Sequence, residues 1–289
     1  MADRSYPPLP EPLPVAVYDD HTHLDPFSGE GWFRDEDGAA LDWREQLDRA
    51  AAVGVKGVVQ VGTDVESSRW SAEAAASEPR MLAAVAIHPN DAARLSEEDL
   101  DAAIAVIDGL AAQPRVRAVG ETGLDFFRTG EEGRAAQFRS FEAHIDIAER
   151  HGLALQIHDR DAHAEVVSTL LRVGAPERTV FHCFSGDAGL ARLAAERGWY
   201  LSFAGTVTFK TAVGLRAALA VTPLDRILVE TDAPYLAPTP MRGRPNAPYL
   251  VPHTLRLMAA ELGVDVAELG AQVAANTEAV YGDWAAGLP

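Results

Sequence analysis

Eight short apolar runs alternate along the chain with longer segments of helical character. The strand-like runs are Val15–Tyr18, Val55–Val61, Met81–Ile87, Val116–Gly120, Leu153–His158, Thr179–His182, Trp199–Phe203 and Arg226–Glu230. The helix-like segments between them are Asp42–Ala52, Val65–Ser77, Glu97–Leu110, Gly133–His151, Asp161–Val173, Asp187–Arg197 and Lys210–Leu219. Strands that alternate with helices form parallel βαβ units. The pattern predicts an α/β fold, a closed (β/α)8 TIM barrel, with an open doubly wound sheet as the alternative.

One domain accounts for most of the 289 residues, because a barrel of this kind occupies about 250 residues as a single unit. We expect the barrel over residues 15–285, with two closing helices over Pro248–Leu262 and Val264–Tyr281. Residues 1–14 are rich in proline and are expected to form a semi-rigid leader outside the fold.

Composition restricts the compartment and the partners. The single cysteine, Cys183, rules out an internal disulfide framework and fits a reducing compartment, and no apolar run is long enough for a signal peptide or a membrane span. A cytoplasmic protein without a membrane partner is therefore expected. The net charge of -18, from 43 acidic and 25 basic residues, argues against a protein that coats nucleic acid through a broad basic surface. The chain contains no glycine-rich nucleotide-binding motif, so no nucleotide cofactor is expected.

Histidines and acids stand where the predicted strands end. Two of them, His21 and His23, are one residue apart, and residues i and i+2 of a strand share a face. Barrel enzymes build their active sites from the carboxyl ends of the strands, so polar side chains from different strands meet there. The further polar residues after the third to eighth strands include, in chain order, His88, Glu121, Asp125, His158, Arg160, His182 and Asp232.

Six of these side chains form a candidate metal-binding set, which comprises His21, His23, Glu121, His158, His182 and Asp232. Six ligands are too many for one tetrahedral ion and suit two divalent ions that share a carboxylate. Such a pair clamps the attacking and leaving oxygens of a displacement, with Glu121 as the bridge and Asp232 as ligand and proton acceptor for the attacking water. Imidazole-rich sites accept Zn²⁺ or Mn²⁺. Cys183 is interpreted as a small buried thiol, and the histidines on predicted helices or loops, His144, His151, His163 and His253, as surface or packing residues.

Six motifs, in this order and spacing, resemble the TatD family of metal-dependent deoxyribonucleases. They are D-x-H-x-H-L-D, I-H-P, V-G-E-T-G-L-D-F, I-H-D-R-D-A, H-C-F-S-G and E-T-D-A-P-Y-L, and the similarity extends from about Asp19 to Tyr281. The resemblance implies a TIM barrel of the amidohydrolase superfamily, the same six metal-ligand positions, and hydrolysis of DNA from the 3′ end of single strands. It also implies that magnesium supports catalysis.

Substrate contacts are predicted near the metal ligands. Arginine forms bidentate bonds to phosphate oxygens, so Arg160 and Arg242 or Arg244 are expected to contact the DNA backbone. The structural alternative for Arg160 is a salt bridge with Asp159 or Asp161. His88 and Asp125 complete the predicted substrate-binding set, and the acidic segment 27–41 leaves substrate access open.

Two other functions compete with the nuclease. An amidohydrolase-type enzyme would act on a small cyclic amide, a lactone or a phosphoester, and such enzymes often bridge their metals with a carbamylated lysine on the fourth strand. Here Glu121 directly follows the predicted fourth strand, and the only lysines, Lys56 and Lys210, lie elsewhere. A non-catalytic metal-binding protein would have lost ligands, and none of the six is missing. The oligomeric state, the native metal and the physiological substrate stay open.

Overall fold

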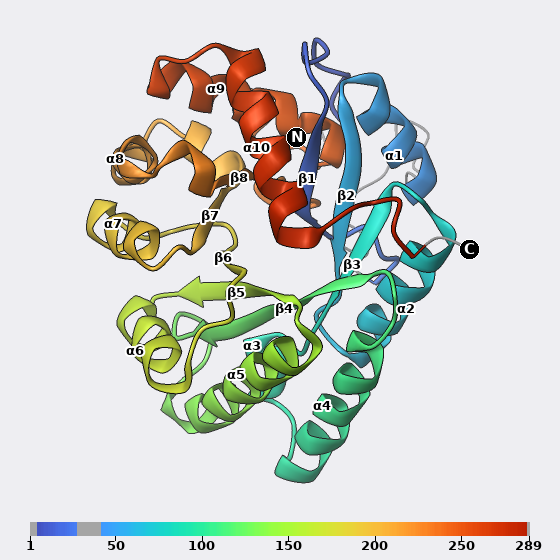
Figure 1. The fold of residues 1–289 in the computed structure, drawn as a ribbon, viewed down its shortest axis with the longest axis vertical. Helices are drawn as coiled ribbons and strands as arrows, with labels where there is room; N and C mark the ends of the chain where they lie inside the picture. The colour runs from blue at the N-terminus through green and yellow to red at the C-terminus, as the bar shows by residue number, and fades with distance from the viewer. Residues whose placement is uncertain (1–4, 28–41, 288–289) are drawn as a thin grey trace.

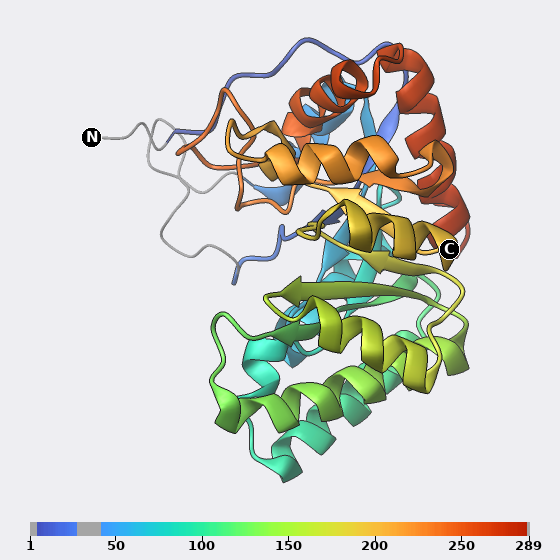
Figure 2. The same cartoon turned by 90° about the vertical axis from the view of Figure 1, so that its left-hand side faces the viewer.

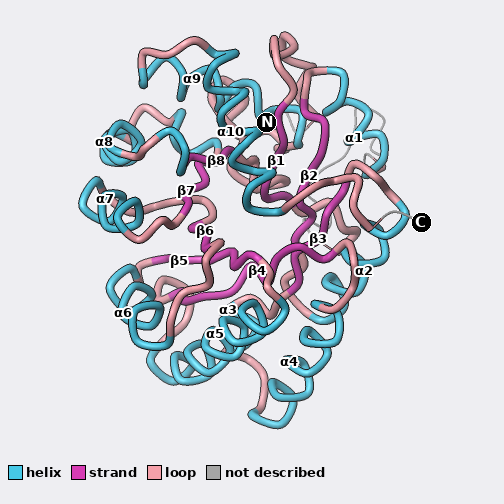
Figure 3. Tube along the Cα trace, viewed as in Figure 1, coloured by secondary structure: helices cyan, strands magenta, loops and turns pink. Residues whose placement is uncertain are grey.

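The computed structural model describes residues 5–27 and 42–287, and its strands form one parallel sheet in the order β1 to β8 (Figure 1). The strands are β1 Val17–Thr22, β2 Val55–Val61, β3 Met81–Val85, β4 Val116–Asp125, β5 Ala154–Arg160, β6 Thr179–Phe181, β7 Tyr200–Phe203 and β8 Ile227–Val229. Figure 3 shows these strands arranged in a ring with the helices outside it.

The ring closes between β1 and the segment after β8. Thr22 forms a parallel bridge with Ala233, and the amide of His23 donates to the carbonyl of Ala233 (2.7 Å). The amide of Asp232 donates to the carbonyl of His21 (2.9 Å). The predicted TIM barrel is therefore confirmed, and the doubly wound alternative is excluded.

The helices cover the outside of the barrel in nearly the predicted places. They are α1 Trp43–Ala52, α2 Val65–Ser77, α3 Pro89–Ala92, α4 Glu97–Ala111, α5 Glu131–His151, α6 His163–Val173, α7 Ala188–Glu196, α8 Val213–Val221, α9 Val251–Leu262 and α10 Val266–Tyr281. The short α3 was not expected, whereas α9 and α10 confirm the two closing helices. Gly263 separates them in a left-handed conformation (φ 67°) that glycine adopts without steric cost. No helix within 5–27 and 42–287 combines the length and apolarity that crossing a membrane requires.

Strand β1 carries polar side chains into the barrel interior, where other strands satisfy them. Asp20 is fully buried and accepts hydrogen bonds from the hydroxyls of Ser202 (2.7 Å) and Tyr281 (3.1 Å). Gln156 donates to the carbonyl of Asp20 and to the hydroxyl of Tyr281, both at 2.7 Å. These partners on β5, β7 and α10 allow β1 to continue through the polar residues that the sequence analysis placed after its end, because buried polar groups need hydrogen-bond partners.

Residues 5–14 lie against the barrel, which corrects the expectation that this leader is outside the fold. Leu13 is buried and its amide donates to the carbonyl of Val53 (3.0 Å). Tyr249 donates its hydroxyl hydrogen to the carbonyl of Pro7 (2.8 Å), and Arg256 on α9 donates to the carbonyls of Glu11 (2.7 Å) and Pro12 (3.0 Å). In Figure 2 the segment, in blue, runs along the top of the molecule beside the C-terminal helices. Proline has no backbone N–H but keeps its carbonyl as a hydrogen-bond acceptor, so a proline-rich segment can bind to the barrel through its carbonyls.

Candidate metal centre

Two imidazoles on β1 converge at the carboxyl end of the barrel. His21 and His23 are buried, and their Nε2 atoms lie 3.3 Å apart. The Nδ1 atom of His23 is 2.9 Å from the carbonyl oxygen of Val61. If Nδ1 carries the proton and donates it to that carbonyl, Nε2 of His23 keeps its lone pair for a cation.

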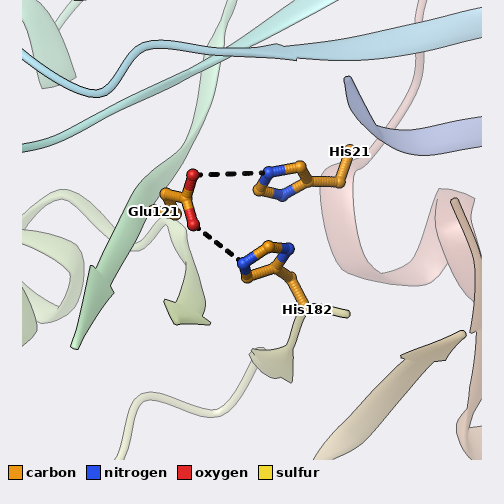
Figure 4. Close-up of side chains that lie close together, drawn as sticks. All are labelled: His21, Glu121 and His182. Carbon is orange, nitrogen blue, oxygen red and sulfur yellow. Dashed lines mark ion pairs between the residues drawn. The ribbon is translucent and has the colours of Figure 1, made fainter. Parts of the chain in front are cut away.

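Glu121 lies between two groups of histidines. Its Oε1 atom is 3.5 Å from Nε2 of His23 and 3.9 Å from Nε2 of His21. Its Oε2 atom is 2.8 Å from Nε2 of His182 and 2.9 Å from Nδ1 of His158. Figure 4 shows His21 and His182 on the same side of the carboxylate, with each imidazole facing one of its two oxygens, and the two rings are stacked with their centres 3.9 Å apart. Each oxygen of one carboxylate thus faces a different pair of imidazoles.

Glycines on β4 allow Glu121 to reach this position. A Cβ atom at Gly120 would lie 2.4 Å from Cβ of Gln156, and one at Gly123 would lie 2.1 Å from the carbonyl oxygen of His158. Gly123 also has a φ of 142°, which side chains other than glycine rarely tolerate. The two glycines therefore let β4 approach β5 closely. The sequence analysis ended the strand at Gly120, whereas β4 continues to Asp125 and contains Glu121.

Asp232 completes the group around His21 and His23. Its Oδ1 atom is 3.5 Å from Nε2 of His23 and 3.9 Å from Nε2 of His21. The residue adopts a φ of 54°, in the left-handed region where aspartate is enriched among residues other than glycine. The hydrogen bond from its amide to the carbonyl of His21 holds this conformation across the seam of the barrel.

Two further carboxylates lie behind the histidines. Asp125 is buried, and its Oδ2 atom is 3.3 Å from Nε2 of His158. The structure thus places Asp125 behind His158, which differs from the predicted substrate contact. Glu230 was not selected from the sequence, although it belongs to the E-T-D-A-P-Y-L motif. Its Oε1 atom is 3.4 Å from Nδ1 of His182 and accepts the amide of Cys183 (2.8 Å). Carboxylates in such positions fix the tautomer and orientation of metal-binding histidines.

The electrostatics favour positive charge at the centre. Burial would raise the pKa of Glu121, but the charge of His182 and neighbouring imidazoles hold it well below its usual range. Burial lowers the pKa of His21 well below its usual range, so this imidazole is neutral. Burial opposes protonation of His23, His158 and His182, but the neighbouring carboxylates outweigh it: they raise the pKa of His23 to about 9 and those of His158 and His182 above their usual value. These imidazoles release a proton when they bind a cation, and deprotonated imidazoles with ionised carboxylates are the donor set of Zn²⁺ and Mn²⁺ sites, so the residues fit divalent metal. Burial and then the charge of Asp232 raise the pKa of the Cys183 thiol well above its usual range, which agrees with an inert thiol.

Within the described residues, three donor groups have their ligand atoms within 4.8 Å of one another. They are His21 with Glu121 and His182, His21 with His23 and Asp232, and His88 with Glu121 and His158. The six predicted ligands therefore come together, as expected. His88 adjoins them: its Nε2 atom is 3.4 Å from Nδ1 of His158 and 3.8 Å from Oε2 of Glu121.

The predicted phosphate-binding arginines have different surroundings. The Cζ atom of Arg160 lies 4.0 Å from the ring centre of Phe127, and that of Arg242 lies 4.0 Å from the ring centre of Phe209. Arg244 donates to the carbonyl and the hydroxyl of Ser5 and to the carbonyl of Tyr6. Its guanidinium therefore binds the N-terminal segment, which differs from the predicted contact with a phosphate. Of the acidic segment 27–41, all but Phe27 is outside the described residues.

Asp19, the first residue of the D-x-H-x-H-L-D motif, was not selected as a site residue from the sequence, and it ties β1 to the segment after β8. Its carboxylate accepts the amide and the hydroxyl of Thr231, at 2.8 and 2.5 Å. Burial raises the pKa of Asp19 to about 8. The contact positions the two segments that carry His21 and Asp232.

Comparisons with known proteins agree with this centre. A family model described as TatD related DNase matches residues 18–282. The chain is 44% identical over 270 residues to an uncharacterized metal-dependent hydrolase TatD from Mycobacterium tuberculosis, covering 92% of this chain and 98% of that protein. It is 34% identical over 251 residues to the 3′-5′ ssDNA/RNA exonuclease TatD of Salmonella typhimurium, covering 84% and 94% of the two chains.

The fold has solved counterparts. The crystal structure of YJJV, a TatD homologue from Escherichia coli, superposes with a TM-score of 0.79 at 26% identity and covers 92% of this chain and 97% of that one. A TatD family hydrolase from Entamoeba histolytica superposes with a TM-score of 0.78 at 17% identity, covering 92% and 98%, which supports the fold alone.

Proposed function

Because the chain belongs to the TatD family of metal-dependent hydrolases, we propose that it hydrolyses phosphodiester bonds in DNA, acting from the 3′ end of single strands. The observation that carries the proposal is the position of Glu121, with one oxygen toward His21 and His23 and the other toward His158 and His182. A carboxylate placed in this way is suited to link two divalent ions.

We assign the residues to two linked sites. His21, His23 and Asp232 would hold one ion, His158 and His182 would hold the other, and Glu121 would serve both sites. Bound divalent ions, with magnesium expected and zinc or manganese possible, supply stabilisation of the charge that develops on the phosphate oxygens. Asp232 Oδ1 accepts the proton of the attacking water. Asp125 and Glu230 keep the imidazoles of His158 and His182 oriented.

The acidic surface charge fits local recognition of a strand end. A net charge of -18 repels a polyanion at long range, so affinity has to come from a few phosphate contacts and the metals. Few contacts mean a shallow dependence of binding on salt, with each neutralised phosphate contributing a slope of about -0.7 for single strands. The relative from Salmonella typhimurium is named for the same polarity and strandedness.

The proposal is tested with a 5′-labelled single-stranded oligonucleotide and magnesium, manganese or zinc, sampled over time. We expect a descending ladder of products shortened from the 3′ end, and more than one metal ion per chain on saturation. Glu121→Gln and Asp232→Asn should abolish the ladder in folded protein, whereas Glu149→Gln, on the exposed outside of α5, should not change it. Turnover of dihydroorotate or another small cyclic amide without cleavage of DNA would favour the amidohydrolase alternative instead.

A further inference from the structure

The largely exposed aromatic side chains of the described residues lie on loops that follow β1, β4 and β8. They are Phe27, Phe127 and Tyr235, with exposed fractions of 43%, 61% and 45%. Scattered exposed apolar residues need no special explanation. Here the aromatic ones all follow strands at the carboxyl end of the barrel, where the metal centre lies. This distribution indicates a surface that receives a ligand with flat apolar faces.

Phe127 is the most exposed of the three, and the strands of the centre hold it in place. The guanidinium of Arg160 lies over its ring, with Cζ 4.0 Å from the ring centre. Arg160 pairs with Asp125 in the β4–β5 register, and its carbonyl accepts the amide of Phe126 (2.9 Å). Arg160 also stands two residues after His158 on β5, so the two side chains share a face of the strand.

The guanidinium and the ring form a unit that we call the Phe127–Arg160 platform. A largely exposed ring offers a flat surface for a base, and an arginine beside it offers a cation for the adjoining phosphate. Stacking on a ring accepts every base, because each base has a π face. A base inside a duplex already stacks on its neighbours, so an unpaired strand can use the platform and an intact duplex cannot.

We propose that the Phe127–Arg160 platform binds a nucleobase near the cleaved phosphate and thereby selects single-stranded substrate. This inference rests on the proposed function and adds a specificity-determining residue to it. Base-to-ring stacking is worth about 1–3 kcal/mol per base, which corresponds to a 5- to 150-fold change in binding. Such a contribution is large for a protein whose overall charge opposes its substrate.

The experiment compares Phe127→Ala, Phe127→Leu and Phe127→Trp on two strands, one normal and one with abasic nucleotides near its 3′ end. On the normal strand we expect kcat/KM to fall 5- to 150-fold for Ala and for Leu, mainly through KM, and to be retained for Trp. On the abasic strand wild type should show the same loss, and Phe127→Ala should add nothing to it. Leu171→Ala, an exposed position on α6, serves as the control and should change neither strand.

The outcomes separate the two proposals. Unfolding temperature and metal content should match wild type, because the Phe127 side chain is 61% exposed and binds no metal. If wild type cleaves DNA and Phe127→Ala or Phe127→Leu cleaves the normal strand equally well, the stacking role is wrong while the nuclease stands. An equal loss for Phe127→Ala on both strands would also overturn stacking. A wild type that cleaves no DNA with any metal refutes the nuclease and the platform together.

Discussion

Asp125→Asn tests whether this carboxylate orients His158 or contacts substrate, as the sequence first suggested. In the structure one oxygen of Asp125 lies 3.3 Å from Nε2 of His158 and accepts the amide of the Asn90 side chain (2.9 Å), and the other accepts the backbone amide of Arg128 (2.8 Å). Every neighbour in these three contacts can donate a hydrogen bond. An asparagine has one oxygen and one NH2 group, so one of its sides will place a donor against a donor.

The expected size follows from what the contact does for His158. A proton held on Nε2 by Asp125 leaves the lone pair of Nδ1 directed toward Glu121 and the proposed metal pair. Loss of such an outer carboxylate reduces metal affinity or activity by about 10- to 100-fold, or about 1.4–2.7 kcal/mol. Asp125 is buried, so the variant should leave the surface offered to substrate unchanged.

The assay is DNA cleavage as a function of manganese concentration, with direct metal titration by calorimetry. We expect the half-saturating metal concentration of Asp125→Asn to rise 10- to 100-fold and kcat to recover largely at saturating metal, with little change in KM for DNA. Asp146→Asn, on the exposed side of α5, is the matched control and should resemble wild type. Unchanged metal affinity together with a raised KM for DNA would refute the orienting role and restore the predicted substrate contact.

Three further expectations concern stability. Arg115 is buried and donates to several backbone carbonyls, including those of Trp284 and Ala286 in the C-terminal segment. Arg115→Met should lower the free energy of unfolding by about 2–6 kcal/mol, since each unpaired buried carbonyl costs about 1–3 kcal/mol. A loss under 1 kcal/mol in urea unfolding would contradict this. Burial lowers the pKa of His144 from 6.5 to about 4, so the unfolded chain binds a proton first as the pH falls. The free energy of unfolding should therefore fall by up to about 3 kcal/mol between pH 6.5 and 4, with no loss above pH 6.5. This loss should be smaller in His144→Gln than in wild type, and equal dependence of stability on pH in the two proteins would count against it. Manganese at 100 times its dissociation constant should stabilise the protein by about 2.7 kcal/mol for each site that only the folded state provides. The measurement is a rise in Tm that EDTA reverses. A Tm that saturating metal leaves unchanged would argue against a site formed by folding.

The strands were predicted best where apolar residues define most of the run. The bounds of β2, Val55–Val61, agree with the prediction, because valines stand at both ends and in the middle of this run and the polar Gln60 is its only buried polar residue. β1 and β4 were drawn too short, because both continue through polar residues or glycines that ordinarily end a strand. In β1 the reason is the set of hydrogen-bond partners that β7 and α10 supply to Asp20. No local sequence pattern announces partners that are 182 and 261 residues away.

The same reasoning explains which parts of the centre were predictable. Side chains at strand ends could be chosen by their chemistry, so the six candidate ligands were found and do come together. Asp125 and Glu230, for which we propose an orienting role, carry the same kind of side chain as a ligand or a substrate contact. Only the position relative to His158 and His182 distinguishes the roles, and that position depends on the register of β4 with β5 and on the end of β8. Arg244 shows the same limit, because its partners lie in the N-terminal segment.

Barrel closure and assembly of the centre depend on the same contacts. The seam between β1 and the segment after β8 consists of the hydrogen bonds from the amide of Asp232 to His21, from the amide of His23 to Ala233, and from Thr231 to the carboxylate of Asp19. These bonds set the 3.5 Å separation between His23 Nε2 and Asp232 Oδ1. Since the two histidines and Asp232 are more than 200 positions apart in the chain, neither segment can form this donor group alone. A cation that binds there therefore links the first strand to the last, so metal binding and closure of the barrel reinforce each other.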